Sequence, residues 1–189
     1  EFKKAIEINP GCAEAHYNLG ALLVKLNKIH EAENEFRKAI EINPRYFSAH
    51  NDLGALLANR NSFSEAEEEY RKAIEINPGN SEVHNNLAGL LLNLNKIPEA
   101  EEAYKKAIKL NPDYAEAHYG LGFLLVNLNK IPEAEKEFRE AVRLKPGYAE
   151  AHYNLGILLA RTNRFQEAEE EYREAIKINP DLAEARANL

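Results

Sequence analysis

NPGCAEAHYNLGALLVKLNKIHEAENEFRKAIEINP, residues 9–44, begins and ends on the same Asn-Pro dipeptide. The dipeptide returns every 34 residues along the chain, at Asn77-Pro78, Asn111-Pro112 and Asn179-Pro180, with Lys145-Pro146 as a variant. A fixed period of this length is typical of a repeat array, in which each unit is one small supersecondary structure that stacks on its neighbours.

Counting from Ala13 divides the chain into full repeats of 34 residues. These are residues 13–46, 47–80, 81–114, 115–148 and 149–182, with partial repeats at 1–12 and 183–189. We expect residues 1–189 to form a single array. Because the opening residue is not Met and falls within a predicted helix, we also expect the sequence to be a fragment of a longer protein.

The composition narrows the classes of partner. The chain is 44% hydrophobic and 29% charged, and no apolar run approaches the roughly 18 residues of a membrane-spanning helix. We therefore expect no membrane partner. The net charge of -7 argues against the concentrated basic surface that nucleic-acid binding requires. A lone cysteine, Cys12, cannot form an internal disulfide, which favours a reducing compartment and predicts a cytoplasmic location.

Each repeat is predicted to fold as two helices. In the first repeat, apolar residues keep a helical spacing from Leu19 through Leu22 and Leu23 to Leu26, and resume it from residue 29. The break between them carries an asparagine, which tolerates the left-handed conformation that closes a helix. Equivalent asparagines are Asn27, Asn61, Asn95, Asn129 and Asn163.

Proline positions agree with these helix boundaries. Pro98 and Pro132 fall at the start of second helices, where a missing N–H costs little. The Asn-Pro dipeptide ends each second helix, because proline disfavours helical geometry in the residue before it.

Small residues recur where the two helices are expected to approach closely, and an aromatic residue follows on the second helix. The first-helix positions are Gly20, Gly54, Ala88, Gly122 and Gly156. The second-helix alanines are Ala32, Ala66, Ala100, Ala134 and Ala168, and the aromatics four residues later are Phe36, Tyr70, Tyr104, Phe138 and Tyr172. We interpret these as packing positions.

Together these residues resemble the tetratricopeptide repeat family across the whole chain. The family pattern of Leu-Gly, Ala, an aromatic, Ala and a closing Pro is present as Leu19, Gly20, Ala32, Phe36, Ala39 and Pro44, and it recurs in every later repeat with only Ala88 replacing the glycine. The resemblance implies an all-α fold, an alpha-alpha superhelix (solenoid) of stacked 34-residue helical hairpins. It also implies a concave groove, lined by first helices, that binds peptides or other proteins.

The two helices expose different chemistry. The outward positions 34, 35, 37, 38 and 41 of the second helix, with their equivalents, are almost all charged. In every full repeat the Arg or Lys at position 37 also follows a Glu at position 33, four residues earlier on the helix. Positions 14, 17, 18, 21, 24 and 25 and their equivalents, here called the first-helix face, carry few charges and several large apolar residues. We expect the first-helix face to meet a partner.

Asparagines recur at one position of this face, at Asn18, Asn86, Asn154 and Asn188, interrupted by Asp52 and Gly120. An amide both donates and accepts, which suits the backbone of an extended peptide, and the pattern is similar to the asparagine ladder of O-linked N-acetylglucosamine transferases. Hydrogen bonding between repeats is the alternative. The predicted peptide-binding residues are Tyr17, Asn18, Asn51, Asn85, Asn86, Leu92, Asn93, Tyr119, Phe123, Asn127, Tyr153 and Asn154.

Acidic residues on the first-helix face favour a neutral or basic partner and argue against the acidic tails of chaperones. They are Glu14, Asp52, Glu82, Glu116 and Glu150.

Histidines recur where the family often carries Trp, at His16, His50, His84, His118 and His152. Stacked repeats hold equivalent residues about 10 Å apart, too far to share a metal ion. We expect a packing role at the seam between helices, a minor effect of low pH on stability, and no metal. No nucleophile and base pair or phosphate-binding loop is present, so we expect neither a cofactor nor enzyme activity.

Three functions stay open at this point. The first is an adaptor that binds a peptide or protein segment on the first-helix face. The second is a scaffold that self-associates end to end, through Phe2, Ile6 and Ile8 at one end and Leu189 at the other. The third is a substrate-recruiting arm of a larger enzyme.

Overall fold

A computed structural model of the chain describes the backbone of residues 2–188 and, apart from residues 2, 3 and 5, their side chains. Over that range every helix or strand element is an α-helix, which confirms the predicted all-α fold class. None of these helices has both the length and the apolar composition that crossing a membrane requires.

The chain divides into two compact units at the turn of the third full repeat, between Asn95 and Lys96. The first unit contains α1 (Phe2–Ile8), α2 (Ala13–Lys25), α3 (Ile29–Ile42), α4 (Phe47–Asn59), α5 (Phe63–Ile76) and α6 (Ser81–Asn93). The second contains α7 (Ile97–Leu110), α8 (Ala115–Asn127), α9 (Ile131–Leu144), α10 (Ala149–Arg161), α11 (Phe165–Ile178) and α12 (Ala183–Ala187). The single array over residues 1–189 stays a prediction.

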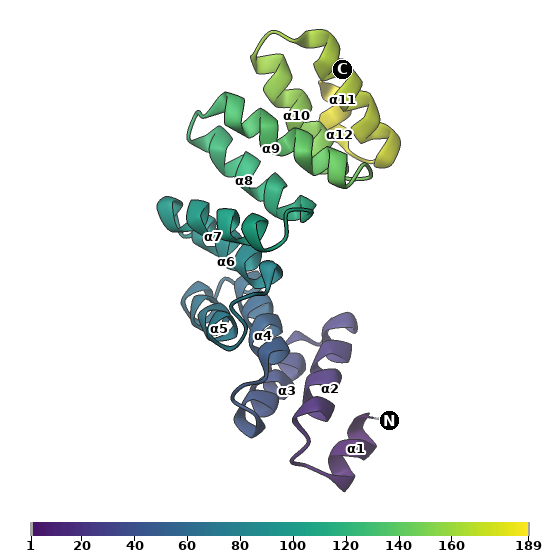
Figure 1. Cartoon of the computed structure of the whole chain (residues 1–189). Helices are drawn as coiled ribbons and strands as arrows, with labels where there is room; N and C mark the ends of the chain where they lie inside the picture. The colour runs from purple at the N-terminus through teal and green to yellow at the C-terminus, as the bar shows by residue number, and fades with distance from the viewer. Residues whose placement is uncertain (1, 189) are drawn as a thin grey trace. The chain divides into compact units, whose positions relative to one another are not determined.

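Helices pair as antiparallel hairpins within each unit (Figure 1). In the first unit α2 pairs with α3 and α4 with α5, and in the second α8 pairs with α9 and α10 with α11. The second helix of a repeat also packs on the first helix of the next, as α3 does on α4 and α9 on α10. Each hairpin is thus covered by its neighbours. A hairpin of this size needs that cover, because its own apolar core is too small to be stable alone.

The turn inside each hairpin has the predicted asparagine in the left-handed conformation. The φ angles are 57° at Asn27, 60° at Asn61, 57° at Asn95, 55° at Asn129 and 61° at Asn163. In the first repeat the backbone N–H of Lys28 then donates to the carbonyl of Leu23 over 2.8 Å. This bond satisfies a carbonyl that the end of the helix leaves without a partner.

The Asn-Pro dipeptide closes the second helix through its side chain as well as its backbone. α3 ends at Ile42, and Asn43 Oδ1 accepts a hydrogen bond from the backbone N–H of Arg45 over 3.1 Å. The same bond, from a backbone N–H two residues on, recurs at Asn9, Asn77, Asn111 and Asn179. The predicted helix ends are confirmed. Pro98 and Pro132 lie in the first turn of α7 and α9, one residue after the start of each helix, as predicted.

Aromatic rings of the second helix lie directly on the glycines of the first. A Cβ atom built on Gly20 would stand 2.8 Å from a ring carbon of Phe36, and one on Gly122 would stand 2.8 Å from Phe138. Real Cβ atoms do not approach that closely, so only glycine fits without movement. The expected packing role of these residues is confirmed.

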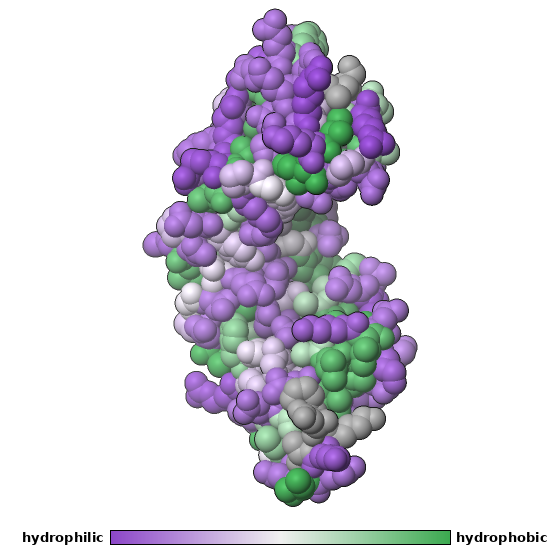
Figure 2. Space-filling view, turned by 90° about the vertical axis from the view of Figure 1, so that its right-hand side faces the viewer, coloured by the Kyte–Doolittle hydropathy of each residue, from purple (hydrophilic) through white to green (hydrophobic). Residues whose placement is uncertain are grey.

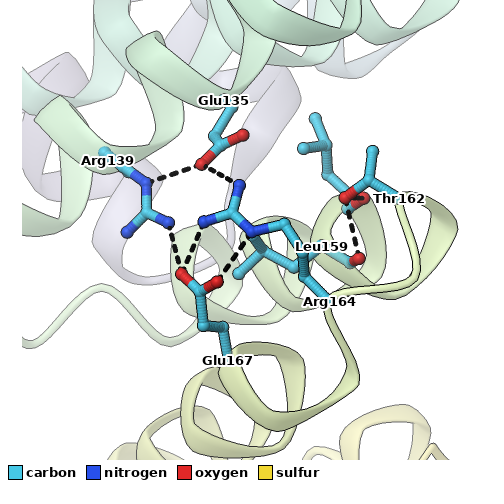
Figure 3. Close-up of polar contacts among 7 residues, drawn as sticks. Glu135, Arg139, Leu159, Thr162, Arg164 and Glu167 are labelled. Carbon is cyan, nitrogen blue, oxygen red and sulfur yellow. Dashed lines mark hydrogen bonds and ion pairs between the residues drawn. The ribbon is translucent and has the colours of Figure 1, made fainter.

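Ion pairs cover the outward side of the second helices. All five predicted pairs form, at Glu33–Arg37, Glu67–Arg71, Glu101–Lys105, Glu135–Arg139 and Glu169–Arg173. Figure 3 shows how two repeats are joined in the second unit: Arg164 donates to Glu135 over 2.7 Å and to Glu167 over 2.5 Å, and Arg139 bonds both carboxylates.

Two leucines that the helical spacing places in the core are exposed instead. Leu22 is 41% exposed and Leu26 59%, whereas Leu56 and Leu124, the equivalents of Leu22, are 6% and 0% exposed. For Leu22 the physical reason is that α1 has 7 residues and α3 has 14, so less helix lies along α2 on that side. Leu26 directly follows the last residue of α2, and its equivalent Leu128 is also exposed, at 37%. On the face seen in Figure 2, hydrophilic residues predominate and apolar ones gather in the half that holds the N-terminus.

Candidate functional site

The first-helix face is carried by neighbouring helices in each unit, because α4 packs beside α6 and α8 beside α10. Of the predicted peptide-binding residues, the first unit holds Tyr17, Asn18, Asn51, Asn85, Asn86, Leu92 and Asn93, and the second holds Tyr119, Phe123, Asn127, Tyr153 and Asn154. Phe123, Asn93 and Asn127 are exposed, and the others except Asn51 are half-buried.

Hydrogen bonds link this face from one repeat to the next. Asn86 Nδ2 donates to Asn51 Oδ1 over 3.2 Å, and Asn154 Nδ2 donates to the Tyr119 hydroxyl over 3.1 Å. Tyr17 donates to Asp52 Oδ2 over 3.0 Å, and Asn188 donates to the hydroxyl of Tyr153 over 3.4 Å, across the same 35-residue separation. Bonding between repeats, the alternative for the asparagine positions, is therefore present, and their role toward a ligand stays a prediction.

Asn51 lies differently from the position that the sequence predicts. Its side chain is only 7% exposed, donates to Asp52 Oδ1 over 3.1 Å and accepts from Asn86. The amide of Asn51 is thus hydrogen-bonded within the protein. The reason is that position 17 of one repeat, here Asn51, faces position 18 of the next repeat, here Asn86.

The interruption at Gly120 has a structural reason. A Cβ atom on Gly120 would stand 2.6 Å from Cζ of Tyr104, whose side chain is 5% exposed. The Tyr104 ring therefore occupies the space that a side chain at position 18 takes in the other repeats. Tyr104 belongs to the repeat 81–114, in which Ala88 replaces the usual glycine.

Contacts with tilted aromatic rings hold Tyr17 of the first-helix face in place. The Tyr17 ring centroid lies 5.1 Å from that of Tyr46 and 5.8 Å from that of Phe36. Burial, together with the Asp52 carboxylate, raises the pKa of Tyr17 to about 12. Tyr17 is therefore neutral at physiological pH and serves as a hydrogen-bond donor to Asp52.

A cavity of about 420 Å³ opens on this face in the first unit, between α2, α3 and α4. Its apolar lining comes from Ala21, Val24, Ile29, Phe36, Ala55 and Leu56, and its polar lining from Lys25, Asp52, Asn59 and Arg60. The sequence prediction missed it. The signal was the pair of alanines at 21 and 55, where the second unit has Phe123 and Ile157.

The recurring histidines lie at the seam between the two helices of a hairpin, as predicted. His16 Nδ1 lies 2.6 Å from Glu35 Oε2, and its Nε2 lies 3.1 Å from the carbonyl oxygen of Pro10. His50, His118 and His152 repeat both contacts. Both ring nitrogens face acceptors, so the protonated imidazolium satisfies them together.

The glutamates that contact these histidines correct the prediction that position 35 and its equivalents face outward. Glu35, Glu69, Glu137 and Glu171 are all half-buried. The third repeat has Ala103 at this position, and His84 keeps its contact with the Pro78 carbonyl. In the part of the chain that the structure describes, no three His, Cys, Asp or Glu side chains gather as a metal site would require.

Protonation of two of these histidines is favoured by the fold. The hydrogen bond with Glu171 raises the pKa of His152 against the opposing effect of burial. For His118, burial lowers the pKa, but the hydrogen bonds with Glu137 and with the Pro112 carbonyl outweigh it, and the net shift is upward.

Sequence comparison finds family models along the chain. A model for the tetratricopeptide repeat matches residues 17–81 and 124–183, which together are more than half of the chain. A further tetratricopeptide repeat model matches residues 69–102, and a TPR repeat model matches residues 90–129. No curated protein matches the chain.

Solved structures match over nearly the whole chain. YrrB, described as a TPR protein with an unusual peptide-binding site, is 28% identical, with a TM-score of 0.73 over 98% of this chain and 96% of that one. PilF of Pseudomonas aeruginosa is 24% identical, with a TM-score of 0.86 over 93% of this chain and 80% of that one. TTC0263, a thermophilic TPR protein of Thermus thermophilus, is 21% identical, with a TM-score of 0.76 over 93% and 96%.

Proposed function

Because the chain belongs to the tetratricopeptide repeat family, whose fold is typical of protein–protein interaction modules, we propose that it is a non-catalytic adaptor that binds a peptide or an extended protein segment on its first-helix face. The single observation that carries the proposal is the cavity of about 420 Å³ on that face. The likeness to YrrB, described as having a peptide-binding site, supports it.

The distribution of polar groups also favours this face over the outward side of the second helices. Outward charges are engaged with one another in ion pairs, as at Glu135 and Arg139. On the first-helix face, Asn93 and Asn127 are exposed amides that can donate to and accept from a peptide backbone. Phe123, 42% exposed, adds an apolar contact.

A neutral or basic segment suits the charge of this face. Glu14, Glu82 and Glu150 are exposed there. Glu116 contributes less, because Lys145 pairs with it over 2.6 Å. The remaining acidic excess attracts basic ligands at low salt and weakens as salt screens it.

The test is peptide-display selection on the chain, followed by binding measurements with purified variants. Asn93→Ala with Asn127→Ala removes exposed amides and leaves the hydrogen bonds between repeats intact. Lys106→Ala, on the outward side, is the matched control, and circular dichroism checks helicity. Selected peptides that bind the control but lose affinity for the double variant support the proposal. Selection of no peptide, or equal binding to both variants, contradicts it.

End-to-end self-association is a second candidate, favoured by the exposure of apolar side chains near one end of the chain. Ile8 is 85% exposed and Leu26 59%, and Ile6 is half-buried. The side chain of Phe2 and the whole of Leu189, which this prediction also used, lie outside the described residues. Sedimentation velocity over a range of concentrations tests it: a monomer at high concentration, unchanged by Leu26→Glu, contradicts this candidate.

A substrate-recruiting role within a larger enzyme and a cytoplasmic location stay predictions from the sequence. A pull-down from cells that express the protein, followed by its localisation in those cells, tests both.

A further inference from the structure

We propose that the cavity of the first unit recognises a basic side chain, arginine or lysine, of the bound segment, with Asp52 as its counter-charge. The proposal rests on the proposed function, because it names the chemistry of one position in the segment that the first-helix face binds.

Asp52 is a half-buried carboxylate whose hydrogen-bond partners are neutral. The Tyr17 hydroxyl donates to Oδ2 over 3.0 Å and Asn51 Nδ2 donates to Oδ1 over 3.1 Å. No lysine or arginine among the described residues pairs with it. Burial raises the pKa of Asp52, and the two hydrogen bonds offset only part of this effect. A half-buried anion without a cation is stabilised by one that enters, and each of its oxygens can accept a second hydrogen bond.

The cavity walls suit the aliphatic stem of a long basic side chain. Ala21, Val24 and Ala55 line the walls and Phe36 also faces the space. Lysine and arginine commonly bury their methylene groups against apolar surface while the charged head reaches a polar partner. A volume of about 420 Å³ accommodates one such side chain.

The two basic residues that line the cavity, Arg60 and Lys25, do not neutralise Asp52. The guanidinium of Arg60 is bonded to Glu33. Lys25 is exposed at the rim and forms no ion pair in the described part of the chain. A solvated lysine has little electrostatic effect, whereas a carboxylate held by two hydrogen bonds in a partly desolvated site has more.

One departure from the repeat pattern, Asp52, meets a pair of small residues in this one cavity. Asp52 is the charged residue at a position that otherwise holds Asn18, Asn86, Gly120, Asn154 and Asn188. Ala21 and Ala55 open the space at a position where the third repeat has Gly89 and the fourth and fifth repeats carry Phe123 and Ile157. A carboxylate and a cavity that gives a ligand access to it therefore occur together, as a pocket selective for a basic side chain requires.

The chain itself supplies the variants for a test. Asp52→Asn introduces the residue that three other repeats carry and removes only the charge. Ala21→Phe introduces the residue found at position 123 and fills the cavity. Both are tolerated at equivalent positions, so we expect folded proteins, checked by circular dichroism and thermal unfolding.

The probes are single blocked amino acids titrated into the full chain, with the methyl NMR signals of Ala21, Val24 and Ala55 as the readout. N-acetyl-arginine N-methylamide is compared with its neutral isostere made from citrulline, and with the blocked amides of norleucine and glutamate. We expect saturable shifts with arginine, about tenfold weaker binding of citrulline, a similar loss in Asp52→Asn, and no binding to Ala21→Phe. Lys25→Ala should strengthen arginine binding.

Other outcomes overturn the proposal. Equal shifts for arginine and citrulline, or arginine binding that Asp52→Asn leaves unchanged, show that Asp52 is not the counter-charge. Glutamate binding that Lys25→Ala abolishes would assign the cavity to acidic segments. The absence of shifts with every probe would leave the cavity without this ligand.

Peptides from display selection separate this inference from the proposed function. If selected peptides bind wild type and Asp52→Asn equally, and replacing their arginines by citrulline changes nothing, the cavity assignment is wrong and the adaptor function stands. If the blocked arginine binds but no peptide is selected, the cavity assignment stands and the adaptor function is wrong.

Discussion

The ring of Tyr104 lies against the backbone of Gly120, with its Cζ atom 2.6 Å from where a Cβ atom of residue 120 would stand. Gly120 is in the middle of α8, a place where glycine ordinarily weakens a helix. The glycine is thus explained by the ring it accommodates and by no property of the helix itself.

Gly120→Ala is expected to destabilise the chain by about 1 to 3 kcal/mol, because the added methyl overpacks against Tyr104. Helix propensity alone predicts the opposite sign, a gain of about 1 kcal/mol. Urea unfolding measures the difference. Gly147→Ala is the control, because a Cβ there would meet nothing within 4 Å. A stabilised Gly120→Ala variant would show that Tyr104 moves aside freely.

Asn154→Ala should lower stability by about 1 to 2 kcal/mol, because Asn154 Nδ2 donates to both the Tyr119 hydroxyl and the Glu150 carbonyl. Asn18 occupies the same position in the first repeat without a hydrogen bond from its side chain in the described part of the chain. Asn18→Ala is therefore expected to change stability by less than about 0.5 kcal/mol. Chemical unfolding of the two variants side by side checks this, and equal effects would contradict it.

Stability should fall as pH rises through neutrality. The folded-state pKa values of His118 and His152 are raised above 6.5 by their carboxylate partners despite burial. A raised pKa contributes stability that is fully present below pH 6.5 and is lost as pH passes the folded value. Thermal unfolding across this range should show the loss, and His118→Gln with His152→Gln should flatten it. An unchanged profile in the double variant would contradict the assignment.

Acid should weaken the equivalent seams of the first unit, where Glu35 contacts His16 and Glu69 contacts His50. Burial raises the pKa of Glu35 and Glu69, but hydrogen bonds with lysine and histidine outweigh it, and both lie below 4.5 in the folded state. Their contribution is present above pH 4.5 and is lost as pH falls through the folded values. Glu35→Gln with Glu69→Gln should show a smaller loss of stability on acidification than wild type does, measured by chemical unfolding at a series of pH values.

Arg164→Ala should raise the pKa of Glu167, which the hydrogen bond with Arg164 and a second one with Arg139 hold at about 2 (Figure 3). With Arg139 still present, we expect a value between about 2 and the ordinary 4.5. Carboxyl carbon NMR titration measures it. Arg143→Ala, which removes the partner of Glu140, should leave Glu167 unchanged.

The helix boundaries followed from the sequence because they depend on neighbours in the chain. The left-handed Asn27 and the Asn43-Pro44 pair act within a few residues, through backbone geometry and short hydrogen bonds. The period of 34 residues then placed every later boundary. The ion pairs four residues apart were predictable for the same reason, since helix geometry alone brings Glu33 to Arg37.

Only the tertiary structure decided which residues of the first-helix face are available. Asn51 and Asn93 were both predicted from the sequence to bind a peptide. In the structure Asn51 is buried and hydrogen-bonded to the next repeat, whereas Asn93 is exposed. Glu35 was predicted to face outward, yet it is half-buried and contacts His16, which lies 19 residues earlier in the chain.

By itself the amino-acid sequence determined the repeat, the hairpin, its caps and the family, because these depend on local geometry repeated at a fixed interval. The cavity beside Asp52 and the packing of the Tyr104 ring on Gly120 depend on how side chains from different helices fill the space between them. This packing brings together residues that are far apart in the chain, so only the tertiary structure decided it.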